Sequence, residues 1–242
     1  MTDRPLDIAV VGSGVSGLTA AWLLARRHRV TLYESDDRLG GHAHTHDVPT
    51  ADGRTLRLDT GFLVHNDRTY PNLLRLFAEL GVPTQESDMS FSVRCDGCGL
   101  EYAGARGFRG VFARPRSLAS PRFLRLLAEV KRFHVQARRV LASDDAETMT
   151  LGAFLDVGGY SRYFADHFML PFTAAVWSTS TDQARAYPAR YLFRFFENHG
   201  MLAIWGSPTW RTVTGGSRTY VERVAARLPE VRAATPVRSI VR

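Results

Sequence analysis

The fold is decided near the start of the chain by Ile8-Ala-Val-Val-Gly-Ser-Gly-Val-Ser-Gly17. The apolar residues 8–11 predict a short buried strand, and a helix is expected to open at about Val15. A second strand is predicted over 29–33 and ends at Glu34, about 20 residues beyond the glycines, where an acid can accept hydrogen bonds from a ribose. This order predicts an α/β fold that holds a dinucleotide, and a glycine-rich turn formed by chance would leave Glu34 unexplained.

Each part of the glycine stretch has a separate physical task. Gly12 permits the tight turn out of the strand, Gly14 lets the backbone approach a pyrophosphate, and Gly17 lets the helix pack close to the sheet. Val15 and Ser16 open a helix whose free N–H groups and positive dipole end favour phosphate oxygens.

The composition is ordinary for a soluble globular protein of 242 residues with a net charge of +7. Lys131 is the single lysine, and the arginines are scattered along the chain, so no nucleic-acid partner is expected. No apolar signal core precedes the first strand, and no run of about 18 apolar residues could span a membrane. Two cysteines make no disulfide scaffold. These features predict a cytoplasmic protein.

A second loop, Arg38-Leu-Gly-Gly41, follows the acid. A plain nicotinamide-binding unit does not need this loop, and its arginine and paired glycines indicate that it wraps the rest of a longer cofactor. His42, His44 and His46 alternate just after it and could in principle bind a metal. No cysteine or carboxylate cluster accompanies them, so no metal is expected, and a polar strand or loop with His42 near the cofactor is favoured.

Cys95-Asp-Gly-Cys98 lies between two short predicted strands, and its Asp-Gly pair predicts a two-residue hairpin turn. A CxxC can serve redox or zinc chemistry. One CxxC supplies only half a zinc site, however, and a redox CxxC normally opens a helix whose dipole lowers a thiol pKa. Neither role is therefore expected of this hairpin.

A long amphipathic helix is predicted over 121–142, with apolar residues on one face and arginines on the other. The arginine-rich face leaves open a peripheral contact with a membrane surface. Packing of the helix on the body of the protein is the favoured interpretation.

Longer phrases are distributed over the whole chain, and they are far more specific than the glycine motif: Asp59-Thr-Gly-Phe62, Thr69-Tyr-Pro-Asn72, Gln85-Glu-Ser-Asp-Met-Ser-Phe-Ser92, Ala175-Val-Trp-Ser178, Asn198-His-Gly200 and Trp210-Arg-Thr-Val-Thr-Gly-Gly-Ser217. With them the chain resembles the flavin-containing amine-oxidase-like superfamily. Within it, the chain is most similar to a bacterial branch of NAD/FAD-binding oxidoreductases.

The resemblance implies non-covalent FAD as the cofactor. Val237 matches a strand whose backbone meets the adenine, and Glu34 matches the acid on the adenosine ribose. The positions that match the family's FAD contacts are Gly12, Gly14, Val15, Ser16, Gly17, Glu34, Arg38, Gly40, Gly41, Asp59, Thr60, Gly61, Gly215, Gly216, Ser217 and Val237.

The resemblance also implies two domains. Residues 1–66 and 210–242 would form a Rossmann-like FAD-binding domain, with a largely helical substrate domain, 67–209, inserted between them. Proteins of the superfamily usually continue past the strand at Val237, so the chain looks like the N-terminal part of a longer protein. Whether this chain alone holds FAD and catalyses is therefore left open.

The activity implied is FAD-dependent oxidation, in which a substrate gives a hydride equivalent to the flavin. Trp177, Trp210 and Tyr220 are candidates for lining the substrate side, and His199 is the candidate acid/base because its pKa suits proton transfer near neutral pH. For each of these four residues, packing in the core is the competing interpretation. The apolar middle of the chain, and a link between relatives and fatty-acid modification, favour a hydrophobic or lipid substrate such as an unsaturated acyl chain.

Two alternatives stay open. An NAD-dependent dehydrogenase fits less well, because the second loop and Val237 suit FAD better. A non-catalytic flavin-binding fragment or interaction module is the other alternative.

Overall fold

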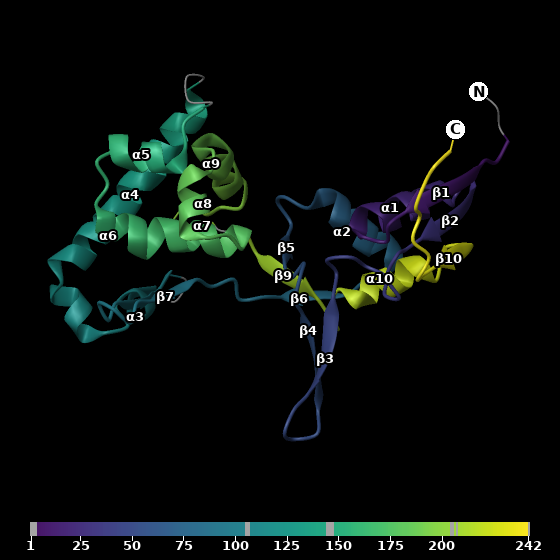
Figure 1. Ribbon diagram of the computed structural model, residues 1–242. Helices are drawn as coiled ribbons and strands as arrows, with labels where there is room; N and C mark the ends of the chain where they lie inside the picture. The colour runs from purple at the N-terminus through teal and green to yellow at the C-terminus, as the bar shows by residue number, and fades with distance from the viewer. Residues whose placement is uncertain (1–3, 105–106, 144–147, 204–205, 207, 242) are drawn as a thin grey trace. The chain divides into compact units, whose positions relative to one another are not determined.

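The computed structural model describes residues 4–104, 107–143, 148–203, 206 and 208–241 (Figure 1). The chain divides into two compact units, Met1–Ser87 with Thr209–Arg242, and Asp88–Pro208. Among the described residues, no helix combines the length and the apolar character needed to cross a membrane.

The first unit contains most of the strands. Its elements are β1 (Asp7–Val11), α1 (Val15–Leu24), β2 (Arg29–Tyr33), β3 (Thr45–Pro49), β4 (Thr55–Asp59), β5 (His65–Asn66), α2 (Pro71–Leu80), β6 (Thr84–Glu86), β9 (Trp210–Val213), α10 (Arg218–Ala225) and β10 (Glu230–Arg232).

A parallel sheet organises this unit, with β2 between β1 and β10. Val11 pairs with Tyr33, so β1 and β2 end at the same edge of the sheet, and α1 is the crossover between them. Leu18 of α1 is 1% exposed and Leu32 of β2 is 0% exposed, which places the core between helix and sheet. The predicted α/β fold is confirmed, and its first strand, helix and second strand lie where the sequence placed them. The first strand was expected to be buried, but no residue of β1 is, and Val11 is 56% exposed.

The boundary between the units follows Ser87, whereas the sequence placed it after residue 66. α2 belongs to the first unit because Phe77 and Leu80 are buried in that unit's core. β6 belongs there because it pairs with β9, and β9 lies in the second segment of this unit, which begins at Thr209. Non-local pairing of short strands therefore shifts the boundary.

The end of the described chain differs from the strand expected at Val237. β10 is the only strand after α10 in the described residues, and the backbone of 235–241 forms none. Thr235 instead donates its backbone N–H to the carbonyl oxygen of Glu34 at 2.7 Å. Val237 is 40% exposed and lies outside any strand, because a strand needs a paired neighbour and residues 235–241 pair with none. Its contact with adenine stays a prediction.

The second unit is largely helical, as expected. Its elements are β7 (Ser92–Arg94), β8 (Glu101–Ala103), α3 (Gly107–Val111), η2 (Pro115–Ala119), α4 (Pro121–Ala142), α5 (Leu151–Val157), α6 (Arg162–Phe164), η3 (Ala165–Met169), α7 (Leu170–Trp177), α8 (Thr181–Ala186) and α9 (Ala189–Asn198). α4 begins at its cap Ser120, whose hydroxyl accepts from the N–H of Phe123.

The apolar face of α4 is buried in the second unit. Phe123 and Leu126 are 0% exposed, and Phe133 is 1% exposed and packs edge-on against Phe193 of α9, with ring centroids 5.4 Å apart. The favoured interpretation of this helix, packing on the body of the protein, therefore accounts for its apolar face. A contact of the arginine-rich face with a membrane surface stays a prediction.

The β7–β8 hairpin has a longer turn than predicted. The N–H of Cys95 donates to the carbonyl oxygen of Leu100 at 2.9 Å, and the N–H of Gly99 donates to that of Cys95 at 2.8 Å. The loop therefore holds four residues, 96–99, in place of two. Gly99 adopts a φ of +69°, a left-handed conformation that glycine accepts without strain.

Candidate cofactor-binding site

Two of the three glycines after β1, Gly12 and Gly17, have the physical roles that their spacing predicts. Gly12 has a φ of +91°, which the tight turn out of the strand requires. A Cβ on Gly17 would lie 1.9 Å from the carbonyl oxygen of Gly12, so no side chain fits between helix and turn. A Cβ on Gly14 would meet nothing within 4 Å. The loop is thus closed toward the sheet at Gly17 and open at Gly14.

Glu34 directly follows β2, and its side chain holds the glycine loop against the end of this strand. Its carboxylate accepts from the N–H of Ser13 at 2.7 Å and from the Ser13 hydroxyl. It also accepts from the Ser35 hydroxyl at 2.9 Å and from the N–H of Asp36 at 3.1 Å. Burial raises the pKa of this carboxyl, but these hydrogen bonds outweigh burial and lower the pKa to about 2.

The lowered pKa makes a prediction about acid stability. A carboxyl with a pKa of about 2 in the folded chain and 4.5 as its ordinary value stabilises the fold above pH 4.5, and this contribution disappears as the pH falls toward 2. Glu34→Gln is expected to lower the unfolding free energy at pH 6 by roughly 2 to 3 kcal/mol. Urea unfolding measures this change in the unfolding free energy.

The difference between Glu34→Gln and the wild type should shrink as the pH is lowered from 6 to 3, because the Glu34 carboxyl, with its ordinary pKa of 4.5, protonates in the unfolded chain while it stays ionised in the folded one. Glu86→Gln, at an exposed position of β6, is the matched control and should leave stability unchanged. A constant difference across this pH range would show that the ionised carboxylate is not what stabilises the loop.

The second glycine loop packs directly on the first. The N–H of Gly40 donates to the carbonyl oxygen of Ser13 at 3.1 Å and to its hydroxyl at 3.0 Å. A Cβ on Gly41 would lie 3.1 Å from the Cα of Gly14. The structure therefore brings together two loops that the sequence assigned to one cofactor.

Arg38 holds the shape of the second loop. Its guanidinium donates to three carbonyl oxygens of its own loop, those of Leu39 at 3.1 Å, Gly41 at 2.9 Å and Ala43 at 3.2 Å. In this structure Arg38 is a positioning residue, and its direct contact with a cofactor stays a prediction.

A third part of the predicted cradle is a polar cluster between β4 and α10. Asp59 accepts two contacts from the N–H of Ser217, at 3.0 and 2.9 Å, and one from its hydroxyl at 2.8 Å. Thr45 donates its hydroxyl to the same carboxylate at 2.5 Å. A Cβ on Gly216 would lie 2.4 Å from the Thr45 side chain, and Gly215 and Gly216 both have positive φ. The cluster ties the β3–β4 hairpin to the start of α10.

Thr60 and Gly61 pack against the histidine segment. The N–H of Thr60 donates to the carbonyl oxygen of His44 at 3.0 Å, and a Cβ on Gly61 would lie 1.9 Å from that of His42. The rings of His44 and His46 lie 3.9 Å apart. Within the described residues, these histidines join no group of three or more potential metal ligands.

A hollow of about 600 Å³ opens beside the two glycine loops. Its walls are residues 14–16, residues 40–43, residues 69–73 at the start of α2, Phe62 and Tyr220. The sequence assigned no role in the site to Phe62 or to residues 69–73, although Phe62 and residues 69–72 belong to the longer phrases that carried the resemblance. With the open face of Gly14 on this hollow, the residues present fit a dinucleotide.

The four candidates for the substrate side divide between the two units. Tyr220 borders the hollow, but it is 1% exposed and packs on Phe77, with ring centroids 5.4 Å apart. Burial, with Asp59 nearby, raises the pKa of its phenol to about 12. Trp210 lies in β9 and is 8% exposed. Tyr220 belongs to the core of the first unit, and Trp210 is buried outside that cluster.

Trp177 and His199 lie in the second unit. Trp177 packs against Phe195 and Tyr187, at 4.8 and 5.1 Å between ring centroids. His199 ends α9, where its ring stacks on Phe195 at 3.9 Å and its Nδ1 lies 2.8 Å from the Phe195 carbonyl oxygen. Core packing accounts for each of these contacts, and their roles toward a substrate stay predictions.

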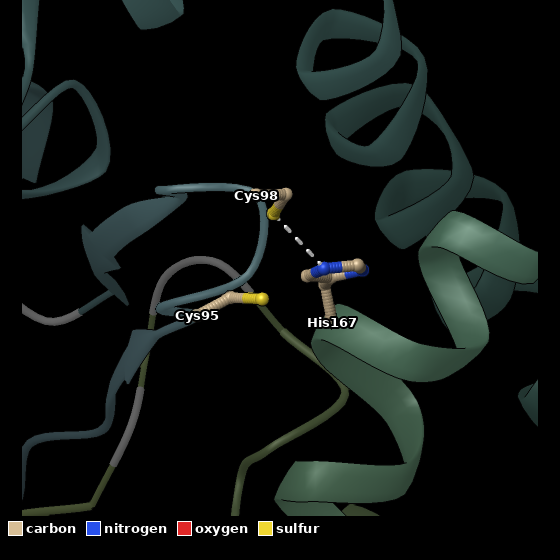
Figure 2. Close-up of side chains that lie close together, drawn as sticks. All are labelled: Cys95, Cys98 and His167. Atoms are coloured by element: carbon tan, nitrogen blue, oxygen red, sulfur yellow. Dashed lines mark hydrogen bonds between the residues drawn. The ribbon is translucent and has the colours of Figure 1, made fainter.

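The structure also gives the hairpin cysteines a partner that sequence reasoning missed. Cys95, Cys98 and His167 lie together in the second unit, with their potential ligand atoms within 4.8 Å of one another (Figure 2). The backbone N–H of Cys98, followed by the side chains of Cys98 and His167, lowers the pKa of the Cys95 thiol to about 7. The CxxC is therefore not an isolated pair. No signal in the sequence indicates this, because His167 comes close to the cysteines only in the folded chain.

Comparison with known protein families matches residues 15–242 to the flavin-containing amine oxidoreductases. The chain belongs to this family. The resemblance inferred from the sequence is thereby confirmed, together with a flavin as the cofactor of the family.

Individual relatives match less completely. The L-amino-acid oxidase of Bungarus fasciatus is 50% identical over 46 residues, which is 19% of this chain and 9% of that protein. Cyclohexylamine oxidase from Brevibacterium oxydans has a TM-score of 0.68 at 18% identity, over 97% of this chain and 52% of that one. A CLA-producing fatty acid isomerase from P. acnes has a TM-score of 0.59 at 18% identity, over the same shares. The chain spans about half the length of these solved structures, which share its fold.

Proposed function

We propose that this chain is the FAD-holding part of an oxidoreductase that takes a hydride equivalent from a hydrophobic substrate. The observation that carries the proposal is the open backbone face of Gly14, bordering a hollow that both glycine loops line. Such a face admits a pyrophosphate where any side chain would intrude.

The chain's residues divide the work of holding the cofactor. The N–H groups at the start of α1 favour the pyrophosphate, and α1 carries no acidic side chain in its first turn to oppose it. Glu34 is the acceptor for ribose hydroxyls, Arg38 holds the shape of the second loop, and the N–H of Gly40 ties that loop to the first. When bound, FAD supplies the redox chemistry, while the protein supplies orientation and a dry pocket.

The substrate proposal is an unsaturated acyl chain. The second unit is rich in buried apolar and aromatic side chains, and such a lining suits a hydrophobic molecule better than a polar amine. One solved structure of the same fold is, by its name, a fatty acid isomerase. His199 remains the proposed acid/base.

The purified chain tests the proposal directly. We expect the visible band of oxidised flavin, or its appearance on reconstitution with FAD, and bleaching by a chemical reductant. Anaerobic bleaching by oleate but not by putrescine would support an acyl substrate, and the reverse would overturn it. A chain that binds FAD without turnover would be a flavin-binding module, and a chain that FAD cannot reconstitute would refute the proposal for this chain alone.

Gly14→Ala separates cofactor binding from folding. Its φ of −61° and ψ of 172° suit alanine, and the new methyl group meets no protein atom within 4 Å, so the thermal transition of the FAD-free chain should not change. The methyl group narrows the hollow, and the dissociation constant for FAD should rise about tenfold or more, as for the loss of 1.4 kcal/mol. Quenching of flavin fluorescence measures it.

Gly104→Ala is the matched control, because a Cβ there also meets nothing within 4 Å and the position lies in the second unit. It should leave FAD affinity unchanged. Equal affinities of Gly14→Ala and the wild type would place the pyrophosphate elsewhere.

A further inference from the structure

Three side chains of the second unit converge on one point. Cys95 and Cys98 come from the turn between β7 and β8, and His167 comes from η3 (Figure 2). The Sγ of Cys98 lies 3.2 Å from the Nε2 of His167, across 69 residues of chain. In a tetrahedral zinc site, sulfur and nitrogen ligands lie about 3.5 to 3.8 Å apart. The three groups, all within 4.8 Å, need only small side-chain movements to reach that geometry.

The hairpin turn is shaped to present both thiols. The carbonyl oxygen of Cys95 accepts from the N–H of Gly99, and the left-handed Gly99 closes the loop. Figure 2 shows the two sulfur atoms on the same side of the turn, toward the helix. The backbone thus holds the pair ready before any ligand arrives.

The imidazole of His167 is set in the tautomer that a metal requires. Its Nδ1 lies 3.0 Å from the carbonyl oxygen of Tyr163, which can only accept, so Nδ1 carries the proton. Nε2 then turns its lone pair toward Cys98. A metal-binding histidine commonly donates its other ring N–H to a backbone carbonyl in this way, which fixes the ring.

The helix around His167 is also held in place. η3 is a π-helical turn, a widened geometry frequent at functional sites. The Tyr102 hydroxyl donates to the His167 carbonyl oxygen at 2.7 Å, and the ring of Tyr163 stacks on the imidazole at 4.2 Å between centroids. Tyr102 belongs to β8, so the same hairpin that carries the thiols also binds the histidine's backbone.

We propose that Cys95, Cys98 and His167 bind one Zn²⁺. Two thiolates and one imidazole are the donor set that zinc prefers. Binding forms three bonds to the metal, releases the two thiol protons to solvent and changes no oxidation state. Among the described residues no fourth histidine, cysteine or carboxylate joins the group, so the fourth position takes water. Cys98 is exposed, which gives the metal a path in.

Metal titration of the reduced, full-length protein tests the proposal. We expect one equivalent of Zn²⁺ to bind, competing with a chromophoric chelator, and to raise the midpoint of thermal unfolding. Co²⁺ should give the visible bands of a tetrahedral site and a thiolate-to-cobalt charge-transfer band. These signals report ligand identity and do not depend on FAD or on turnover.

Variants separate this site from adventitious binding. Cys98→Ser and His167→Ala should each lower the affinity for zinc by about 100-fold or more. Loss of a direct ligand should cost at least as much affinity as loss of an outer-shell partner of a ligand. His46→Ala, at an exposed position of β3 in the first unit, is the matched control and should not change the affinity. Folding of each variant is checked by circular dichroism.

Three results would overturn the proposal. Zinc affinity unchanged in His167→Ala would mean that the cysteines alone capture metal. No stoichiometric zinc on the reduced wild type would exclude the site. A Cys95–Cys98 disulfide that resists reduction under these conditions would make the hairpin a disulfide-bonded turn.

Discussion

Gly17→Ala is expected to lower the unfolding free energy by about 2 kcal/mol or more and to abolish FAD binding. The new Cβ would lie 1.9 Å from the carbonyl oxygen of Gly12, which is a backbone atom and cannot rotate away. Relief of this contact requires α1 to move from the turn after β1. Alanine's better helix propensity returns only about 1 kcal/mol, which is less than overpacking of this severity costs.

Far-UV circular dichroism measures the effect as a fall in the unfolding midpoint of roughly 4 to 8 °C. Comparison with Gly14→Ala separates the effect on stability from the effect on FAD binding, because the two positions lie in the same loop and receive the same methyl group. Gly14→Ala should lose cofactor and keep stability, whereas Gly17→Ala should lose both. A Gly17→Ala chain that melts with the wild type and binds FAD would contradict the close approach of α1 to the turn.

Asp59→Ala is expected to lower the unfolding free energy by about 3 kcal/mol. The change leaves the N–H and hydroxyl of Ser217 and the hydroxyl of Thr45 without their shared acceptor. Ser217 is 1% exposed and Thr45 is 7% exposed, so water replaces the lost acceptor poorly. The carboxylate also lies at the N-terminus of α10, where a negative charge is favourable.

Asp59→Asn is the matched control, since it keeps the size and one acceptor oxygen, and it should lose about half as much stability as Asp59→Ala. Urea unfolding of the FAD-free chain distinguishes two roles of Asp59. Full stability with weakened FAD binding would make Asp59 a cofactor contact only. Lost stability in the absence of FAD would confirm the tie between the β3–β4 hairpin and α10.

Local patterns in the sequence predict local structure well here. β2 has its predicted bounds, and α4 spans 121–142 as expected. The C-cap of α2 is Gly81, whose φ of +66° is the left-handed conformation in which a glycine often ends a helix. Each of these signals lies within the element that it predicts, as periodicity or as a cap. The glycine roles were predictable for the same reason.

Contacts between distant residues account for what the sequence could not show. His167 reaches Cys98 across 69 residues, and Asp59 reaches Ser217 across 158. The observed boundary between the units differs from the predicted one because β6 pairs with β9. The strand expected at Val237 is absent because a strand forms only where a neighbouring strand pairs with it. The sequence predicted most parts of the cofactor cradle, but not which of them hold one another.

In the proposed complex with FAD, Glu34 would meet the ribose with its acceptor positions already filled. A carboxylate offers about four lone-pair sites, and Ser13, Ser35 and Asp36 supply four donors to them. A ribose hydroxyl must therefore displace a protein donor, most readily a serine hydroxyl that can rotate toward solvent. Cofactor entry at this end is an exchange of one hydrogen bond for another and adds little net affinity, so Glu34 contributes discrimination, while the pyrophosphate and the ring systems must supply the binding strength.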